Sequence, residues 1–159
     1  MKRLTLIGMV LLVWLTACAT AKPNEPVASN SDKPVVTIYK SPTCGCCTDW
    51  VAYLADNGYS VMTEYVDDMT PIKTQHQVPQ AMQSCHTAVV DGYVIEGHVP
   101  VAEIERLLTE RPAVIGIAVP GMPIGSPGME TAGVAAQAYD VLTFDEAGNS
   151  EVYASYPGE

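Results

Sequence analysis

The hydrophobic pattern from Val35 onward predicts alternating strands and helices. β-Branched and aromatic runs such as residues 35–39 are typical of buried strands. Apolar residues spaced i, i+3, i+4 and i+7 from Cys47 indicate a helix with one buried face. Asp91-Gly92 between two apolar runs predicts a tight hairpin. The predicted order is strand 35–39, helix 47–57, strand 59–66, helix 70–77, strand 87–90, strand 93–95 and helix 100–112.

The C-terminal third departs from this alternation. Residues 116–128 are rich in glycine and proline and cannot be regular throughout, whereas residues 139–144 and 151–156 predict a terminal hairpin. The earlier elements follow the layout of the thioredoxin fold, with a cysteine motif between the first strand and the first helix. We therefore expect an α/β, thioredoxin-like fold, in which helices flank a mixed central sheet and residues 113–159 add a loop and a β-hairpin.

The N-terminus carries the pattern of an export signal. A basic start is followed by an apolar run over residues 4–14 and by Leu15-Thr16-Ala17-Cys18. The run is too short to span a bilayer, which needs roughly 20 apolar residues. We expect residues 1–17 to be a lipoprotein signal peptide, Cys18 to be lipidated, residues 18–34 to form a flexible tether and residues 35–159 to form the domain. Because Ala19 and not Asp follows Cys18, the pattern resembles periplasmic lipoproteins anchored to the outer membrane.

The overall charge narrows the class of partner. The formal net charge is −10, and such a surface repels nucleic acid and anionic lipid. This negative charge is compatible with binding of metal cations, although most of the carboxylates are expected to lie solvated on the surface.

The cysteines point to a site. The chain has five cysteines; beside Cys18, three lie within four residues at 44, 46 and 47, and the fourth is Cys85. Thiols at a helix N-terminus have a lowered pKa, and Cys44 and Cys47 have the C-x-x-C spacing used in redox exchange. A third thiol exceeds what a dithiol oxidoreductase requires and suits a soft metal such as Cu(I).

Further candidate ligands lie elsewhere in the chain. Cys85 and His86 precede the third predicted strand, and in a thioredoxin fold that segment passes beside the cysteine helix. His98 follows the predicted hairpin and is a weaker candidate. Met122 and Met129 lie in the Gly/Pro-rich loop, where their thioethers would suit Cu(I) or would pack the loop onto the domain.

Three stretches, namely CGCC followed by Trp50, SCHTAVVDGYVIEGHVP and AVPGMPIGSPGME, together resemble the domain of unknown function 411 family, which includes CopG-type copper-resistance proteins. The resemblance covers nearly the whole domain from Val35. It implies a thioredoxin-like fold, a periplasmic setting, a link to copper and silver tolerance, and a thiolate-bridged cluster of several copper ions. The matching positions are Cys44, Cys46, Cys47 and Cys85 and, with less weight, His86, His98, Met122 and Met129.

Three hypotheses follow. In the first, the protein binds Cu(I) through its thiolates, interconverts Cu(I) and Cu(II), and works with other periplasmic copper-efflux or copper-oxidase proteins. In the second, it is a thiol-disulfide oxidoreductase in which Cys44 attacks and Cys47 resolves. In the third, cysteines together with His86 form a closed zinc site. The sequence leaves open whether the protein is an enzyme.

Overall fold

The structure, a computed structural model, describes residues 32–159. The predicted signal peptide, the lipidation at Cys18 and most of the predicted tether lie outside the described residues. The elements are β1 (Val36–Lys40), α1 (Gly45–Asp56), β2 (Val61–Tyr65), α2 (Thr70–Gln75), the 3₁₀ turn η1 (Gln80–Met82), β3 (His86–Val90), β4 (Tyr93–Glu96), α3 (Val101–Glu110), β5 (Gly116–Ala118), β6 (Tyr139–Phe144) and β7 (Ser150–Tyr156).

All seven strands form one mixed sheet in the order β2-β1-β3-β4-β5-β6-β7. β1 pairs parallel with β2, whereas β3 runs antiparallel to both β1 and β4. β4 pairs parallel with β5, and the C-terminal hairpin β6–β7 continues the sheet from there. The added C-terminal segment therefore extends the central sheet and does not form a separate unit.

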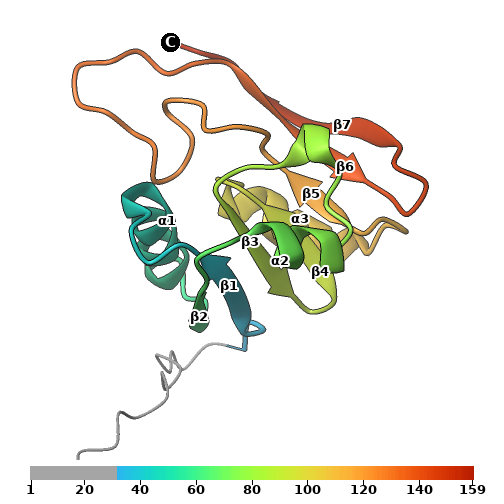
Figure 1. The fold of residues 1–159 in the computed structure, drawn as a ribbon. Coiled ribbons are helices and arrows are strands. Elements are labelled where there is room, and N and C mark those ends of the chain that lie inside the picture. The colour runs from blue at the N-terminus through green and yellow to red at the C-terminus, as the bar shows by residue number, and fades with distance from the viewer. Residues whose placement is uncertain (1–31) are drawn as a thin grey trace, which may run out of the picture.

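The helices cover both faces of this sheet, with α2 in front of it and α3 behind it in Figure 1. On the α3 face, Trp50 and Leu54 of α1 join Ile104 and Leu107 of α3 in the larger apolar core. On the other face, a smaller core packs the segment after α2 against the sheet. Successive residues of β4 face the two cores, Val94 on one side and Ile95 on the other, which explains why both of these neighbours are apolar.

The local predictions are largely confirmed. Asp91, with φ 47°, and Gly92 form the tight turn between β3 and β4. α1 ends at Asp56 with Asn57 as its C-cap, and Gly58 follows with φ 84°, a conformation that favours glycine. β5 lies at the start of the segment that glycine and proline had marked as irregular. None of the helices in residues 32–159 is long and apolar enough to cross a membrane.

The last residues of the predicted tether contact the domain. Lys33 donates to the carbonyl of Asn57 at 2.8 Å, and its ammonium lies 2.5 Å from Glu105 of α3. The same ammonium lies 4.6 Å from the centre of the Tyr59 ring. Just before β1, the chain therefore contacts the C-terminal end of α1 and the middle of α3.

Candidate metal centre

Three of the cysteines lie at the N-terminus of α1. Cys44 is the N-cap, and its sulfur accepts a hydrogen bond from the backbone N–H of Cys47 at 3.3 Å. Cys44 and Cys47 are joined by a disulfide. Cys47 is buried, whereas Cys44 and Cys46 are partly exposed. Because the first N–H groups of a helix carry a partial positive charge, sulfur anions formed here are stabilised.

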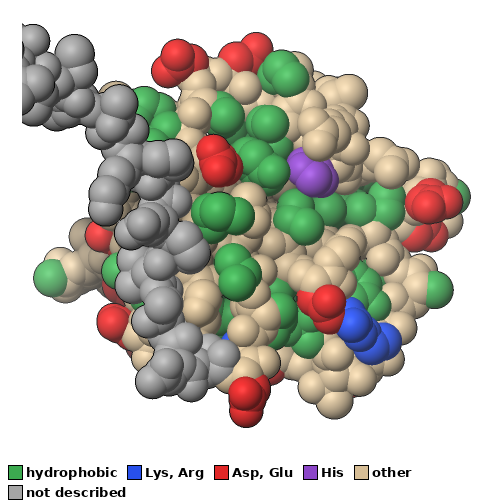
Figure 2. Space-filling view, turned by 90° about the horizontal axis from the view of Figure 1, so that it is seen from below, with side chains coloured by type: hydrophobic (Ala, Val, Ile, Leu, Met, Phe, Trp, Pro, Cys, Tyr) green, Lys and Arg blue, Asp and Glu red, His purple; other side chains and the backbone are tan. Residues whose placement is uncertain are grey.

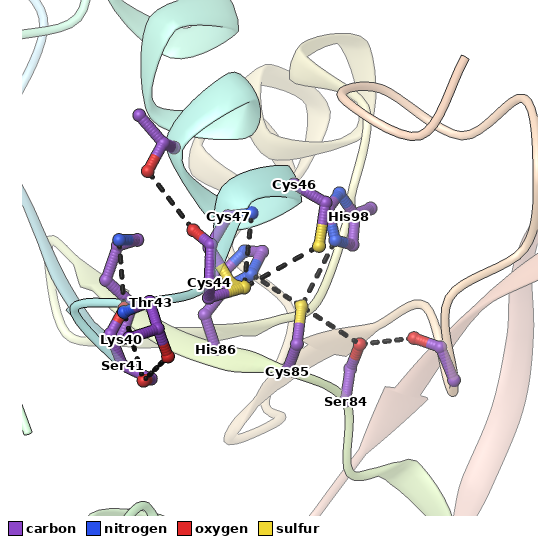
Figure 3. Close-up of a disulfide and its surroundings, with 12 residues drawn as sticks. Lys40, Ser41, Thr43, Cys44, Cys46, Cys47, Ser84, Cys85, His86 and His98 are labelled. Carbon is purple, nitrogen blue, oxygen red and sulfur yellow. Dashed lines mark hydrogen bonds between the residues drawn. A yellow bond between two sulfur atoms is a disulfide. The ribbon is translucent and has the colours of Figure 1, made fainter. Parts of the chain in front are cut away.

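Cys85 meets these three cysteines in space. Cys46 and Cys85 are the free cysteines of residues 32–159, and the four sulfurs all lie within 4.8 Å of one another. The sulfurs of Cys44 and Cys46 are 3.6 Å apart. Figure 3 shows the side chain of Cys85 pointing toward Cys46 from the segment before β3. We call Cys44, Cys46, Cys47 and Cys85 the four-cysteine group.

Two histidines adjoin the four-cysteine group through Cys85. The sulfur of Cys85 lies 3.2 Å from Nδ1 of His86 and 3.1 Å from Nε2 of His98. The three ligand atoms lie within 4.8 Å of one another, so Cys85 is shared by a sulfur group and a Cys-His-His group. His98, the weaker candidate by sequence, thus lies as close to Cys85 as His86 does.

A backbone carbonyl fixes the orientation of His98. Its Nδ1 lies 2.8 Å from the carbonyl oxygen of Pro127, which can only accept a hydrogen bond. Nδ1 therefore carries the proton, and Nε2 presents its lone pair toward Cys85. This arrangement is the one that metal-binding histidines use, because the outer hydrogen bond sets both the tautomer and the ring angle.

His86 is fully buried and lacks one partner. Its ring centroid lies 4.4 Å from that of Trp50 and 5.0 Å from that of His98. Among residues 32–159, its Nε2 has no hydrogen-bond partner. A buried polar atom left unpaired is uncommon in native structures. Four sulfurs and two imidazoles form a set of donors that suits a soft metal ion.

Burial sets the protonation states at the site. It raises the pKa of the Cys85 thiol to about 12, and nearby Cys46 adds to the shift. Burial also holds the pKa of His86 well below its usual range, with His98 and Lys73 contributing, and it lowers the pKa of His98. Both imidazoles are therefore neutral near pH 7 and free to bind a metal. The Cys85 thiol favours its protonated form, which a bound cation would reverse.

The loop after β5 closes over the cysteine helix. Figure 1 shows it in orange, reaching α1. Gly128 has φ 79°, and a Cβ there would lie 2.7 Å from the backbone nitrogen of Trp50. Trp50 in turn donates from Nε1 to the carbonyl of Val99 at 3.0 Å. Glycine at 128 thus allows the close approach that brings the Pro127 carbonyl to His98. Pro127 and Gly128 were not predicted as site residues, because a glycine beside a proline was the only local signal for them.

The methionines of this loop are placed differently from the cysteines and histidines. Met122 is 52% exposed on the loop surface, and Met129 is half-buried, with its backbone N–H bonded to Ser126 at 2.8 Å. Metal ligation by Met122 and Met129 stays a prediction.

Acidic side chains outnumber basic ones in the chain, with 18 Asp and Glu against 8 Lys and Arg. Figure 2 shows acidic side chains scattered over one face, on which little basic surface is visible. The negative potential that follows from this imbalance attracts cations.

The comparisons with known proteins agree with the geometry. Residues 82–129 match the family described as protein of unknown function, DUF411. Two solved structures, described as copper resistance protein CopG in Form 1 and Form 2, are each 43% identical to this chain with a TM-score of 0.75. They align over 80% and 79% of this chain, respectively, and over 100% of their own. The chain belongs to this DUF411/CopG-type family. No curated protein sequence matches it significantly.

The match to the family model covers only part of the candidate metal site. The residues that match DUF411 include Cys85, His86 and His98 and both loop methionines, whereas the cysteines of α1 lie before the matched range. The alignment to the CopG structures extends over most of the chain. The family assignment predicted from the three motifs is therefore confirmed, and the mixed α/β sheet flanked by helices is confirmed with it.

Proposed function

We propose that this protein binds copper as Cu(I) through the thiolates of the four-cysteine group and serves copper resistance or homeostasis. The observation that carries the proposal is the meeting of Cys85 with the three cysteines of α1, all four sulfurs lying within 4.8 Å of one another. Thiolates this close can bridge neighbouring copper ions, and soft sulfur ligands select Cu(I). The names of the two CopG structures support the choice of copper.

The donor set favours copper over other metals. The Mg²⁺ and Ca²⁺ ions prefer oxygen ligands, which are absent from the two groups of ligand atoms described here. Zn²⁺ would accept four sulfur and nitrogen ligands, but copper binds more tightly to such sites. His86 and His98 would complete or shield the copper site, and Met122 and Met129 would add thioether ligands from the loop.

The proposal also includes the cellular location, the fold type and the partners of the protein. The export pattern of residues 1–18 supports a periplasmic protein held at the outer membrane by a lipid on Cys18. Strands β2-β1-β3-β4 support a thioredoxin-like core, because β1 and β2 are parallel and β3 runs antiparallel to both of its neighbours. In this compartment the protein would exchange copper with efflux or copper-oxidase proteins.

The Cys44–Cys47 disulfide makes copper binding dependent on reduction. The sulfurs of Cys44 and Cys47 are not thiolates while they are joined in the disulfide. Two of the four thiolate ligands therefore form only after this bond is reduced. Reoxidation of the pair to the disulfide releases two electrons and two protons. That is sufficient to reduce two Cu(II) ions to two Cu(I) ions, after which Cys46 and Cys85 are the remaining free thiols of the four-cysteine group.

Metal analysis tests the copper proposal. The full chain is reduced, loaded with Cu(I) without oxygen and freed of excess metal, and bound copper is measured with the thiolate-to-Cu(I) absorption in the ultraviolet. We expect retained copper and strong absorption, both reduced by Cys85→Ser. His76→Ala, in α2's C-terminal turn and outside the Cys-His group, is the control and should behave as wild type. A reduced protein that retains no copper would overturn the proposal.

A second function is favoured by one observation. The Cys44–Cys47 disulfide lies at a helix N-terminus with Cys44 partly exposed and Cys47 buried, the arrangement that thiol-disulfide oxidoreductases use. Reduction of insulin disulfides by the dithiol form measures this activity. Activity that survives the Cys46→Ser/Cys85→Ser double variant would favour it over copper binding.

A further inference from the structure

A buried ion pair adjoins the segment that carries Cys85 and His86. Lys73 of α2 is 5% exposed and Glu96 at the end of β4 is 0% exposed, and the ammonium contacts the carboxylate directly. Burying such a pair costs desolvation free energy that the attraction often does no more than offset. Replacing a buried ion pair by well-packed apolar residues of similar volume is often neutral or stabilising. The pair therefore calls for an explanation other than stability.

The carboxylate of Glu96 holds the chain on both sides of two candidate ligands. Oε1 accepts the backbone N–H of Ser84 at 2.7 Å, and Oε2 accepts the hydroxyl of Thr87 at 2.6 Å. Ser84 and Thr87 flank Cys85 and His86 in the sequence. One buried side chain thus bonds the residue before and the residue after the Cys85-His86 pair.

The sheet alone does not fix Cys85. β3 begins at His86, which pairs with Lys40 of β1. The carbonyl of His86 accepts the N–H of Gly97 at 3.1 Å. Ser84 and Cys85 come before the first residue of this ladder. Their backbone is held instead by the Ser84 N–H bond to Glu96 and by the Ser84 hydroxyl, which donates to the carbonyl of Gly121 in the loop.

Lys73 completes the arrangement. Its ammonium also donates to the Thr87 hydroxyl oxygen at 3.2 Å, so that hydroxyl accepts from Lys73 while it donates to Glu96. The contact of the Lys73 ammonium with this carboxylate makes the hydrogen bonds of the group charge-assisted, and charge-assisted hydrogen bonds are stronger than neutral ones. Figure 3 shows the outcome, with Ser84 beside Cys85 and the Cys85 sulfur directed toward Cys46 and His98.

We propose that Glu96 and Lys73 form a positioning pair, which fixes Cys85 and His86 in the geometry needed to bind metal. The pair touches no metal ligand atom itself and acts through Ser84 and Thr87. This inference rests on the proposed copper function. Its test therefore includes a readout that does not depend on copper.

Two double variants separate positioning from stability. Lys73→Met/Glu96→Leu removes the charges together with both hydrogen bonds and leaves no buried charge unpaired. Lys73→Met/Glu96→Gln also removes the charges, but the amide oxygen can accept the Ser84 N–H and the amide N–H can donate to the Thr87 hydroxyl. The two differ only in the bonds to the flanking residues, so the Gln variant is the matched control.

The first readout is the affinity for Cu(I), measured on the reduced full chain by competition with a chromophoric chelator. We expect the Leu variant to lose about 10–100-fold in affinity, as is typical when a group that orients metal ligands is removed, and the Gln variant to stay close to wild type. The second readout is the alkylation rate of Cys85 in the metal-free reduced protein, followed by mass spectrometry. The Leu variant should react several-fold faster than the Gln variant.

Equal behaviour of the two variants in both readouts would overturn the positioning role, whether both match wild type or both are impaired. If wild type itself binds no Cu(I), the copper proposal fails, and the alkylation rates alone decide the positioning role. If the Leu variant does not fold, Thr87→Val is compared with Thr87→Ser. The first removes the hydroxyl that Glu96 holds, and the second keeps it. Weaker binding and faster alkylation in Thr87→Val alone support the role, and equal values overturn it.

Discussion

Replacing Gly128 by alanine tests how the loop after β5 controls the site. Two separate costs follow from the structure. The residue has φ 79°, in the left-handed region, and an alanine there costs about 1–2 kcal/mol. The new Cβ would also lie 2.7 Å from the backbone nitrogen of Trp50 and 3.1 Å from its Cα, so either the loop or α1 must move. Such overpacking costs about 1–3 kcal/mol.

Gly133→Ala isolates the first cost. Gly133 has φ 76°, but a Cβ there would meet nothing within 4 Å. We therefore expect a loss of about 1–2 kcal/mol in the free energy of unfolding for Gly133→Ala and of about 2–5 kcal/mol for Gly128→Ala. Urea unfolding of the reduced, metal-free full chain measures both. Domains are typically stable by about 5–15 kcal/mol, so losses near the middle of these ranges leave both variants folded.

The same displacement should weaken the site. The carbonyl of Pro127, next to Gly128, orients His98 through a 2.8 Å hydrogen bond. Moving it should lower Cu(I) affinity by about 10–100-fold in Gly128→Ala, while Gly133→Ala keeps wild-type affinity. Equal losses of stability in the two variants, together with unchanged copper binding, would refute the link between the loop, His98 and the metal.

Three further predictions follow from the site. Reducing the Cys44–Cys47 disulfide should add two reactive thiols per chain in a thiol titration under denaturing conditions, and an unchanged count would show that the pair is not oxidised. Burial lowers the pKa of His86, so below about pH 6.5 the unfolded chain binds a proton that the folded, metal-free protein does not. Stability should therefore fall as the pH drops from 6.5 to 5, and His86 alone should contribute up to about 1.4 kcal/mol per pH unit; urea unfolding at several pH values measures this, and a folded-state His86 ring that titrates near 6.5 by NMR would contradict it. Trp50→Phe leaves the Val99 carbonyl without its donor and should cost about 1–3 kcal/mol in urea unfolding, and an unchanged midpoint would refute that role.

The sequence predicted elements whose signals are local. Asp91-Gly92 predicted the β3–β4 turn, and Asn57-Gly58 predicted the end of α1, because each depends on the backbone preferences of a few adjacent residues. The approach of Cys85 to α1 was predicted from the element order, since that order places the segment before β3 beside the cysteine helix.

The groups that support the site could not be predicted in this way. A lysine on a short helix, such as Lys73, is ordinarily solvent-exposed, and its contact with Glu96 joins residues 23 positions apart. The hydrogen bond between His98 and the Pro127 carbonyl spans 29 positions and depends on the path of an irregular loop. Neither contact leaves a periodic or motif signal, because each forms only when the whole chain has folded.

The most direct test is a crystal structure of the reduced, Cu(I)-loaded protein with anomalous diffraction data collected at the copper edge. We predict copper bonded to the sulfur of Cys85 together with sulfurs of the cysteines at the start of α1. Copper found elsewhere on the domain, or at the α1 cysteines without Cys85, would contradict the central claim.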